Sequence, residues 1–104
     1  MRHYVFVYYG EPRFTNPEEG GSYRAKWKTW MDGLGDALVN PGVPIGKPKT
    51  VSSDNVSDGD KPNRVTGFSI VQADSIDVAV KMAQACPHLA HGTVDVADAM
   101  EMRV

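Results

Sequence analysis

The sequence predicts an α+β domain whose elements follow the order β-α-β-β-α-β. Three observations lead to this order. An aromatic and β-branched run opens the chain at residues 3–9, a second such run lies at residues 64–73, and an amphipathic helical stretch follows each run. Two helices on one face of a four-stranded antiparallel sheet form the ferredoxin-like arrangement. A chain of 104 residues has the length of one domain, which we assign to residues 1–104.

The first predicted strand, residues 3–9, is apolar on both faces. Side chains of a strand alternate, which places Tyr4, Phe6 and Tyr8 on one face and Val5, Val7 and Tyr9 on the other. Two helices cover only one face of the sheet. We therefore expect a second copy of the chain to cover the helix-free face, which gives a homodimer with its sheets packed face to face.

The first helix is expected over residues 22–39, after a loop at residues 11–21. Ser22 is a suitable N-cap, and the sequence Asn-Pro-Gly that begins at Asn40 ends the helix. One apolar stripe recurs at the helical period and consists of Tyr23, Trp27, Trp30, Met31, Leu34 and Leu38. We expect this stripe to pack against the sheet.

The rest of the chain supplies four further elements. These are a short edge strand at residues 47–52, a long strand at 64–73, a helix at 74–86 and a last strand at 93–102. A polar loop is expected at residues 53–63, Asp74 is expected to cap the second helix, and Pro87 stops it. Its predicted buried face consists of Ile76, Ala79, Val80, Met82 and Ala83.

Composition excludes several classes of protein. The net charge of −2 argues against nucleic acid as a partner, and the basic residues Arg24, Lys26 and Lys28 are spaced as a solvated helix face. No apolar run is long enough to span a membrane, and no signal peptide is visible, so we expect a cytoplasmic protein without a membrane partner. The single Cys86 excludes an internal disulfide and a cysteine-based zinc site. No cofactor-binding motif stands out, and we expect no cofactor.

Two motifs near the end of the chain carry a family resemblance. Residues 85–89, Ala-Cys-Pro-His-Leu, and residues 92–96, Gly-Thr-Val-Asp-Val, resemble the YCII-related domain family, specifically its DGPF-like branch. Weaker support comes from the Tyr9-Gly10 end of the first strand, from the tryptophans of the first helix and from Gly67-Phe68. The resemblance spans nearly the whole chain and implies a ferredoxin-like fold in a dimeric α/β-barrel.

The resemblance implies much less about activity. The signature Asp-Gly-Pro-Phe of the branch is represented only by residues 58–60, Asp-Gly-Asp. The founding branch carries a histidine near the start of the first helix and an aspartate near the end of the second, proposed as a catalytic pair. Tyr23 and Cys86 stand near those two positions here. Distant members resemble chloromuconolactone dehalogenases, which act on small lactone acids.

His88 is the candidate catalytic residue, because it lies just after a helix end and imidazole suits general acid–base chemistry near neutral pH. The alternative interpretation is that it caps the helix C-terminus. His91 makes a metal pair conceivable, but no third ligand is in register, so we expect no metal site. Cys86 is a possible nucleophile or, alternatively, a small buried apolar residue.

The candidate ligand-binding residues are Tyr8, Tyr23, Trp27 and Asp58. Tyrosine hydroxyls in an apolar cavity orient carboxylate or carbonyl groups. The alternative is that the aromatic residues form only packing contacts and that Asp58 only forms a turn before Gly59.

Two functional hypotheses follow from these residues. The first is a homodimer that binds a small, anionic organic ligand in a cleft between sheet and helices. The alternative is a small-molecule enzyme of isomerase or lyase type, in which His88 acts as general acid or base and Tyr8 and Tyr23 orient the substrate.

Overall fold

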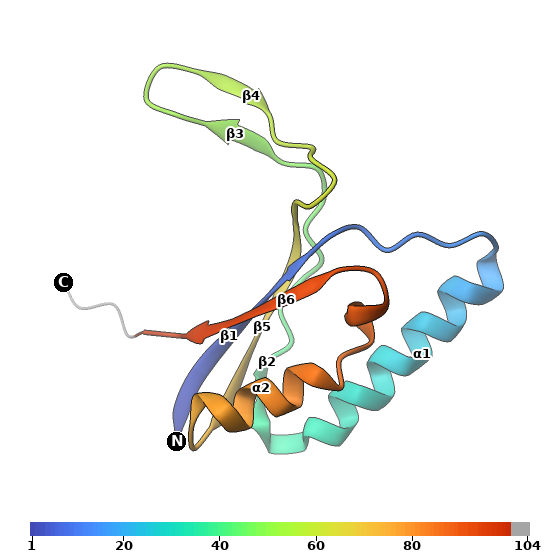
Figure 1. The fold of residues 1–104 in the computed structure, drawn as a ribbon, viewed down its shortest axis with the longest axis vertical. Helices are drawn as coiled ribbons and strands as arrows, with labels where there is room; N and C mark the ends of the chain where they lie inside the picture. The colour runs from blue at the N-terminus through green and yellow to red at the C-terminus, as the bar shows by residue number, and fades with distance from the viewer. Residues whose placement is uncertain (101–104) are drawn as a thin grey trace.

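The computed structural model describes residues 1–100 and contains a four-stranded antiparallel sheet covered on one side by two α-helices (Figure 1). In chain order the elements are β1 (Arg2–Tyr9), α1 (Pro17–Leu34), the 3₁₀ helix η1 (Gly35–Ala37), β2 (Leu38–Asn40), β3 (Lys49–Val51), β4 (Val56–Asp58), β5 (Val65–Ala73), α2 (Ile76–Gln84), the 3₁₀ helix η2 (Pro87–Ala90) and β6 (Thr93–Asp98). The strand order is β2-β5-β1-β6, so the two long strands are central. The predicted ferredoxin-like α+β architecture is confirmed.

Strand β1 has the two apolar faces that its sequence predicts. Tyr4, Phe6 and Tyr8 are buried beneath the helices, while the residues between them are half-buried on the helix-free face. The helix-side core consists of Tyr4, Phe6, Tyr8, Trp30, Val71, Ala73, Ala79, Ala83 and Cys86. Trp30 donates its indole N–H to the carbonyl oxygen of Met82 at 3.0 Å, which ties α1 to α2.

Helix α1 begins five residues earlier than the Ser22 start predicted from the sequence. Asn16 is the N-cap, because its side-chain oxygen accepts a hydrogen bond from the Glu19 amide at 2.9 Å, and Pro17 occupies the first turn. The Glu19 carboxylate in turn accepts from the amide and hydroxyl of Thr15. These caps outweigh the weak helix propensity of the two glycines that follow.

The same helix also ends earlier than predicted. Gly35 adopts a positive φ of 53° and ends α1 after Leu34, since glycine tolerates this conformation without steric cost. After η1 the chain turns into strand β2, so Leu38 is a strand residue that pairs with Val71. The edge strands of this sheet are therefore β2 and β6. A short strand, β3, does form within the predicted residues 47–52, but the prediction that it lies at the edge of this sheet was wrong.

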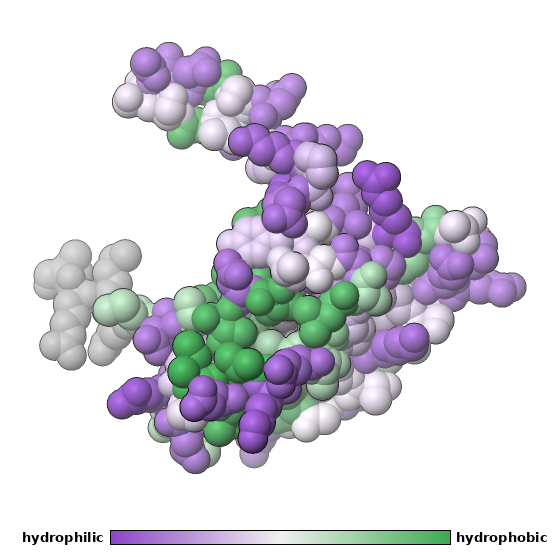
Figure 2. All heavy atoms as spheres, viewed as in Figure 1, coloured by the Kyte–Doolittle hydropathy of each residue, from purple (hydrophilic) through white to green (hydrophobic). Residues whose placement is uncertain are grey.

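Residues 47–58 form instead a separate hairpin. Strands β3 and β4 pair only with each other, with Lys49 opposite Asp58 and Val51 opposite Val56. The predicted polar loop over 53–63 thus contains β4. The hairpin projects beyond the end of β5 and is mostly hydrophilic in Figure 2.

Helix α2 is shorter than the predicted stretch of residues 74–86. Ser75, rather than Asp74, is the N-cap, and its hydroxyl accepts a hydrogen bond from the Val78 amide at 3.3 Å. Ala79 and Ala83 are buried as predicted, but Ile76 and Val80 are exposed. Figure 2 shows hydrophobic residues gathered over the region where α2 and β6 meet.

The last strand, β6, ends at Asp98, earlier than the predicted 93–102. Val94 and Val96 pack on the helix-side core, whereas Met100 is exposed. Met102, the last residue of the predicted strand, lies outside the described residues. Within residues 1–100, no helix combines the length and apolar character needed to cross a membrane.

Candidate functional site

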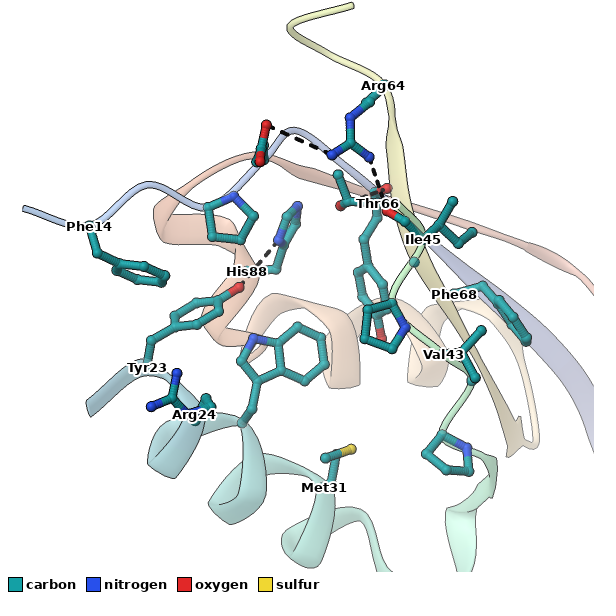
Figure 3. Close-up of a pocket in the computed structure, with 18 residues that line it drawn as sticks. Phe14, Tyr23, Arg24, Met31, Val43, Ile45, Arg64, Thr66, Phe68 and His88 are labelled. Carbon is teal, nitrogen blue, oxygen red and sulfur yellow. Dashed lines mark hydrogen bonds and ion pairs between the residues drawn. The ribbon is translucent and has the colours of Figure 1, made fainter. Parts of the chain in front are cut away.

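A cavity of about 650 Å³ lies between α1, the segment 41–45 that follows β2, and the start of β5. Figure 3 shows Tyr23 and His88 meeting on one side of this cavity, with Val43 and Ile45 of the segment after β2 across from them. The cavity lies between helix and sheet, as the sequence analysis expects for a ligand cleft. Its lining is mainly apolar and aromatic, with a few polar groups, which is typical of a small-molecule site.

The structure brings three of the four predicted ligand-binding residues together. The Trp27 ring packs edge-on against Tyr8, with ring centroids 5.1 Å apart, and against Tyr23 at 6.2 Å. Phe14, from the loop before α1, packs against Tyr23 at 5.3 Å and extends this aromatic wall. All four rings line the cavity.

The ring of Tyr8 lines the cavity, whereas its hydroxyl forms hydrogen bonds within the cavity wall. This hydroxyl donates a hydrogen bond to Ser69 Oγ at 2.8 Å, and Ser69 Oγ donates to the carbonyl oxygen of Pro41 at 2.8 Å. Ser69 is fully buried. The Tyr8–Ser69–Pro41 chain therefore attaches segment 41–45 to the sheet, a role that sequence analysis missed because a lone serine in a strand carries no signal.

Asp58 does not line the cavity. It lies in strand β4, its side chain is 80% exposed, and it forms an ion pair with Lys49 across the hairpin. Pairing of β3 with β4, rather than with the sheet, carries this residue away from the other predicted ligand-binding residues.

His88 is almost fully buried, with 2% of its surface exposed, and both ring nitrogens have partners. Its Nε2 lies 2.7 Å from the carbonyl oxygen of Tyr9, and its Nδ1 lies 3.3 Å from the hydroxyl of Tyr23. A carbonyl oxygen only accepts hydrogen bonds, so Nε2 carries the proton. In the neutral ring Nδ1 then accepts from the Tyr23 hydroxyl, and the ring contacts these two groups rather than the terminal carbonyls of α2.

Gly92 permits the close approach of His88 to strand β1. A Cβ atom at this position would lie 1.9 Å from the Tyr9 carbonyl oxygen and 2.9 Å from His88 Nε2. The carbonyl oxygen of His88 also accepts hydrogen bonds from the amides of His91 and Gly92, which closes the turn after η2. The Gly92 in the C-terminal motif thus has a steric role in holding the imidazole.

Burial raises the pKa of the Tyr23 hydroxyl and, more strongly, that of the Tyr8 hydroxyl. Both phenols are therefore protonated at neutral pH and act as hydrogen-bond donors. Burial also raises the pKa of the Cys86 thiol to about 11. With 3% exposure and a protonated thiol, Cys86 has the environment of a structural cysteine.

Two arginines line the cavity, and neither was a predicted site residue. Arg24, assigned from the sequence to a solvated face, is exposed but borders the cavity. The Arg64 side chain is 8% exposed and donates from Nη1 to the carbonyl oxygens of Ile45 at 3.0 Å and Gly46 at 3.2 Å. Arg64 was not predicted as a site residue, because an arginine at the start of a strand usually points to solvent.

The charge around Arg64 is partly balanced. Its guanidinium lies 3.7 Å from the Glu11 carboxylate and 3.5 Å from that of Asp60, and its buried Nε has no hydrogen-bond partner among residues 1–100. Arg24 has no carboxylate within ion-pair distance in the described part of the chain, so it is the cation at the cavity more available to an anionic ligand.

His91 packs edge-on against Tyr23, with ring centroids 4.9 Å apart, and against Phe14 at 5.2 Å. His91 therefore packs against two aromatic residues that line the cavity. The described residues contain no group of three histidine, cysteine or acidic side chains placed to hold a metal ion.

Comparison with solved structures supports the fold. The chain is similar to 5-chloro-2-hydroxyhydroquinone dehydrochlorinase from Burkholderia phenoliruptrix AC1100, solved in complex with 2,5-dihydroxybenzoquinone, with a TM-score of 0.62 and 14% sequence identity. The similarity covers 96% of this chain and 95% of that one. No protein-family model matches the sequence, and no curated protein matches it. At this identity the likeness establishes a shared fold.

Proposed function

We propose that this chain binds a small, cyclic organic acid in the cavity between α1 and the sheet. The observation that carries the proposal is the hydrogen bond between half-buried Tyr23 and buried His88, which borders a mainly apolar cavity that Arg24, the next residue of α1, also lines. Aromatic rings offer flat surfaces to a planar ligand, and the arginine offers charge to a carboxylate or enolate. The dehydrochlorinase of similar fold was solved with a cyclic, oxygenated molecule, which is compatible with this ligand class.

Calorimetric titration tests this proposal with two anionic probes, benzoate and 2,5-dihydroxybenzoquinone, and with the neutral analogue benzamide. We expect Arg24→Gln to weaken binding of the anionic probes about fivefold or more and to leave benzamide unaffected. Arg13→Gln is the matched control, because Arg13 lies on the preceding loop and does not line the cavity. Absence of binding by any probe at millimolar concentration, or equal effects of both variants, would contradict the proposal.

A second candidate function is proton transfer of the isomerase or lyase type, with His88 as the base. The specific observation that favours it is the tautomer of His88: the Tyr9 carbonyl holds the proton on Nε2, which leaves the Nδ1 lone pair directed to the Tyr23 hydroxyl at the cavity. In this arrangement the Tyr23 oxygen takes the proton from an acidic C–H bond while the Tyr23 hydroxyl proton passes to Nδ1 of His88, and the reverse transfers return a proton to another atom of the same molecule.

Deuterium exchange detects this chemistry without knowledge of the product. We would incubate the protein in D₂O with α-angelica lactone, a five-membered unsaturated lactone with an acidic methylene group, and follow its proton spectrum. Proton transfer by His88 predicts protein-dependent exchange that His88→Gln abolishes and Arg13→Gln retains. Exchange equal to the protein-free rate would reject proton transfer on this lactone.

We also propose that the chain belongs to the YCII-related family and forms a homodimer through the helix-free face of its sheet. The strand register places an apolar group at the centre of this face. It consists of Val5, Val7, Phe68, Ile70 and Ala97. The polar residues His3, Gln72, Thr93 and Asp95 surround them in the same register. An apolar centre with a polar rim is the usual anatomy of a protein interface.

Light scattering tests the dimer. We expect twice the mass of the chain at micromolar concentration and a monomer for Val7→Asp, since Val7 lies at the centre of the face and pairs with Phe68 and Asp95. Val78→Asp on the exposed surface of α2 is the control. A wild-type monomer would contradict the proposal.

A further inference from the structure

The β3–β4 hairpin stands away from the rest of the molecule. Within residues 1–100, β3 and β4 make their substantial contacts with each other and with no helix or other strand. The radius of gyration is 15.2 Å, whereas a compact chain of this length has a value of about 13 Å. A three-residue ladder without further packing is at best marginally stable in water.

The hairpin carries an apolar pair on one of its faces. Val51 and Val56 lie opposite each other near its tip and are 72% and 63% exposed. The Lys49–Asp58 ion pair lies two residues along on the same face, while Thr50 and Ser57 occupy the other face. Two adjacent exposed valines on a lone hairpin form a contact surface that the described residues leave uncovered.

The direction of the hairpin shows which face of the sheet it overhangs. In Figure 1 both helices lie on one side of the sheet, and the hairpin projects past the end of β5 toward the opposite, helix-free side. It therefore overhangs the face on which the apolar group around Val7 lies. A second molecule that packs on this sheet face therefore also contacts the hairpin.

We propose that the β3–β4 hairpin is an arm that clasps a second copy of this chain, with Val51 and Val56 packed on the partner. The inference rests on the proposed homodimer, because the hairpin overhangs the sheet face through which we propose that the dimer forms. The mixed charges of the hairpin, with both Lys49–Asp58 and Lys47–Asp60 paired internally, leave the valines as its main means of attachment.

The arm also connects the dimer to the cavity. Its two stems are segment 41–48 and segment 59–64, and Arg64 on the second stem donates to the carbonyl oxygens of Ile45 and Gly46 on the first. Segment 41–45 and Arg64 both line the cavity. Attachment of the arm to a partner therefore holds one cavity wall in place.

Sedimentation equilibrium of a double variant tests the arm. We expect Val51→Ser with Val56→Ser to raise the dimer dissociation constant at least about tenfold, since both side chains lose apolar contact area. Val78→Ser with Val80→Ser on α2 is the matched control and should change it less than about twofold, because helix α2 lies on the other side of the sheet. The hairpin valines are exposed and β3 and β4 make substantial contacts only with each other, so their replacement leaves the four-stranded sheet and its helices intact.

Hydrogen exchange gives an independent readout. Amides of residues 49–58 should exchange more slowly as the protein concentration passes through the dissociation constant, because the arm becomes packed in the dimer. Exchange of these amides independent of concentration would overturn the proposal.

The sheet-face variant Val7→Asp separates the arm from the dimer face. A dimer that Val7→Asp disrupts and the hairpin variant leaves unchanged overturns the arm and retains the sheet dimer. A dimer sensitive to the hairpin variant and insensitive to Val7→Asp supports the arm and overturns the sheet face. A wild-type monomer overturns both.

Discussion

The hydroxyl of Tyr23 and Nδ1 of His88 lie 3.3 Å apart, although 65 residues separate them in the chain. Tyr23 lies in α1, whereas His88 lies in the 3₁₀ turn after α2, and the sheet beneath both helices sets their separation. In the founding branch of the family that the sequence resembles, a histidine and an aspartate occupy the two positions near which Tyr23 and Cys86 stand in this chain. Here a tyrosine and a histidine meet instead.

Replacement of Tyr23 by phenylalanine removes this hydrogen bond and retains the aromatic packing. We expect Tyr23→Phe to lower the free energy of unfolding by about 0.5–1.5 kcal/mol, the usual value for one hydrogen bond. Urea unfolding measures the change. An unchanged midpoint would mean that the hydroxyl bonds equally well to water in the cavity.

Gly92 and Gly33 predict opposite responses to the same substitution. Gly92→Ala should destabilise the protein by more than about 2 kcal/mol, because the new Cβ would lie 1.9 Å from the Tyr9 carbonyl oxygen. Gly33→Ala, within α1 and with no atom within 4 Å of the added Cβ, should stabilise it by roughly 0.5–1 kcal/mol. Thermal unfolding of both variants checks the pair. Equal effects would contradict the steric role of Gly92.

Ser69 predicts a non-additive double-mutant cycle with Tyr8. Ser69→Ala leaves the Tyr8 hydroxyl and the Pro41 carbonyl without their partner and should cost about 1–3 kcal/mol. Tyr8→Phe in addition should cost less in the Ser69→Ala background than in the wild type, because the hydroxyl it removes is already unpaired. Additive effects in urea unfolding would show that Tyr8 and Ser69 act independently.

Cys86 predicts a loss of stability at alkaline pH. Burial raises the thiol pKa from 9.0 to about 11, so between these values the native state holds a proton that the unfolded state releases. The protonated Cys86 thiol therefore contributes its full share of the unfolding free energy below pH 9, and this share is lost as the pH rises toward 11. We expect Cys86→Ala to flatten the pH dependence of the unfolding free energy by up to about 2 kcal/mol over this interval. Parallel wild-type and variant profiles would contradict the assignment.

The same thiol should react slowly. At pH 8 we expect alkylation of Cys86 by iodoacetamide to be at least about a hundredfold slower than that of a free thiol, since both the protonated state and the burial oppose it. The rate in the unfolded protein is the control. Rapid labelling of the folded protein would restore Cys86 as a candidate nucleophile.

Residues with a strong periodic signal could be predicted from the sequence. Apolar residues repeat every 2 residues in a strand and every 3.6 residues in a helix, and these periods can be read from neighbouring residues alone. They predict the two faces of β1, the long strand β5 and the α1 stripe at Tyr23, Trp27 and Trp30. Element ends were less accurate, because capping by Asn16 and the positive φ at Gly35 compete with propensity over only a few residues.

Some features of the candidate site could likewise be predicted from the sequence, and others could not. Residue type and the spacing of apolar residues were enough to predict the fold class and the candidates Tyr8, Tyr23, Trp27 and His88, because both are read directly from the order of residues in the chain. The three-dimensional arrangement was needed to show that these four residues line one cavity, that Arg24 and Arg64 border it, and that Asp58 lies outside it on a hairpin. Such contacts depend on which strand pairs with which, and β3 pairs with β4 rather than with the sheet. Pairing of distant segments is set by packing of the whole chain, which no local pattern encodes.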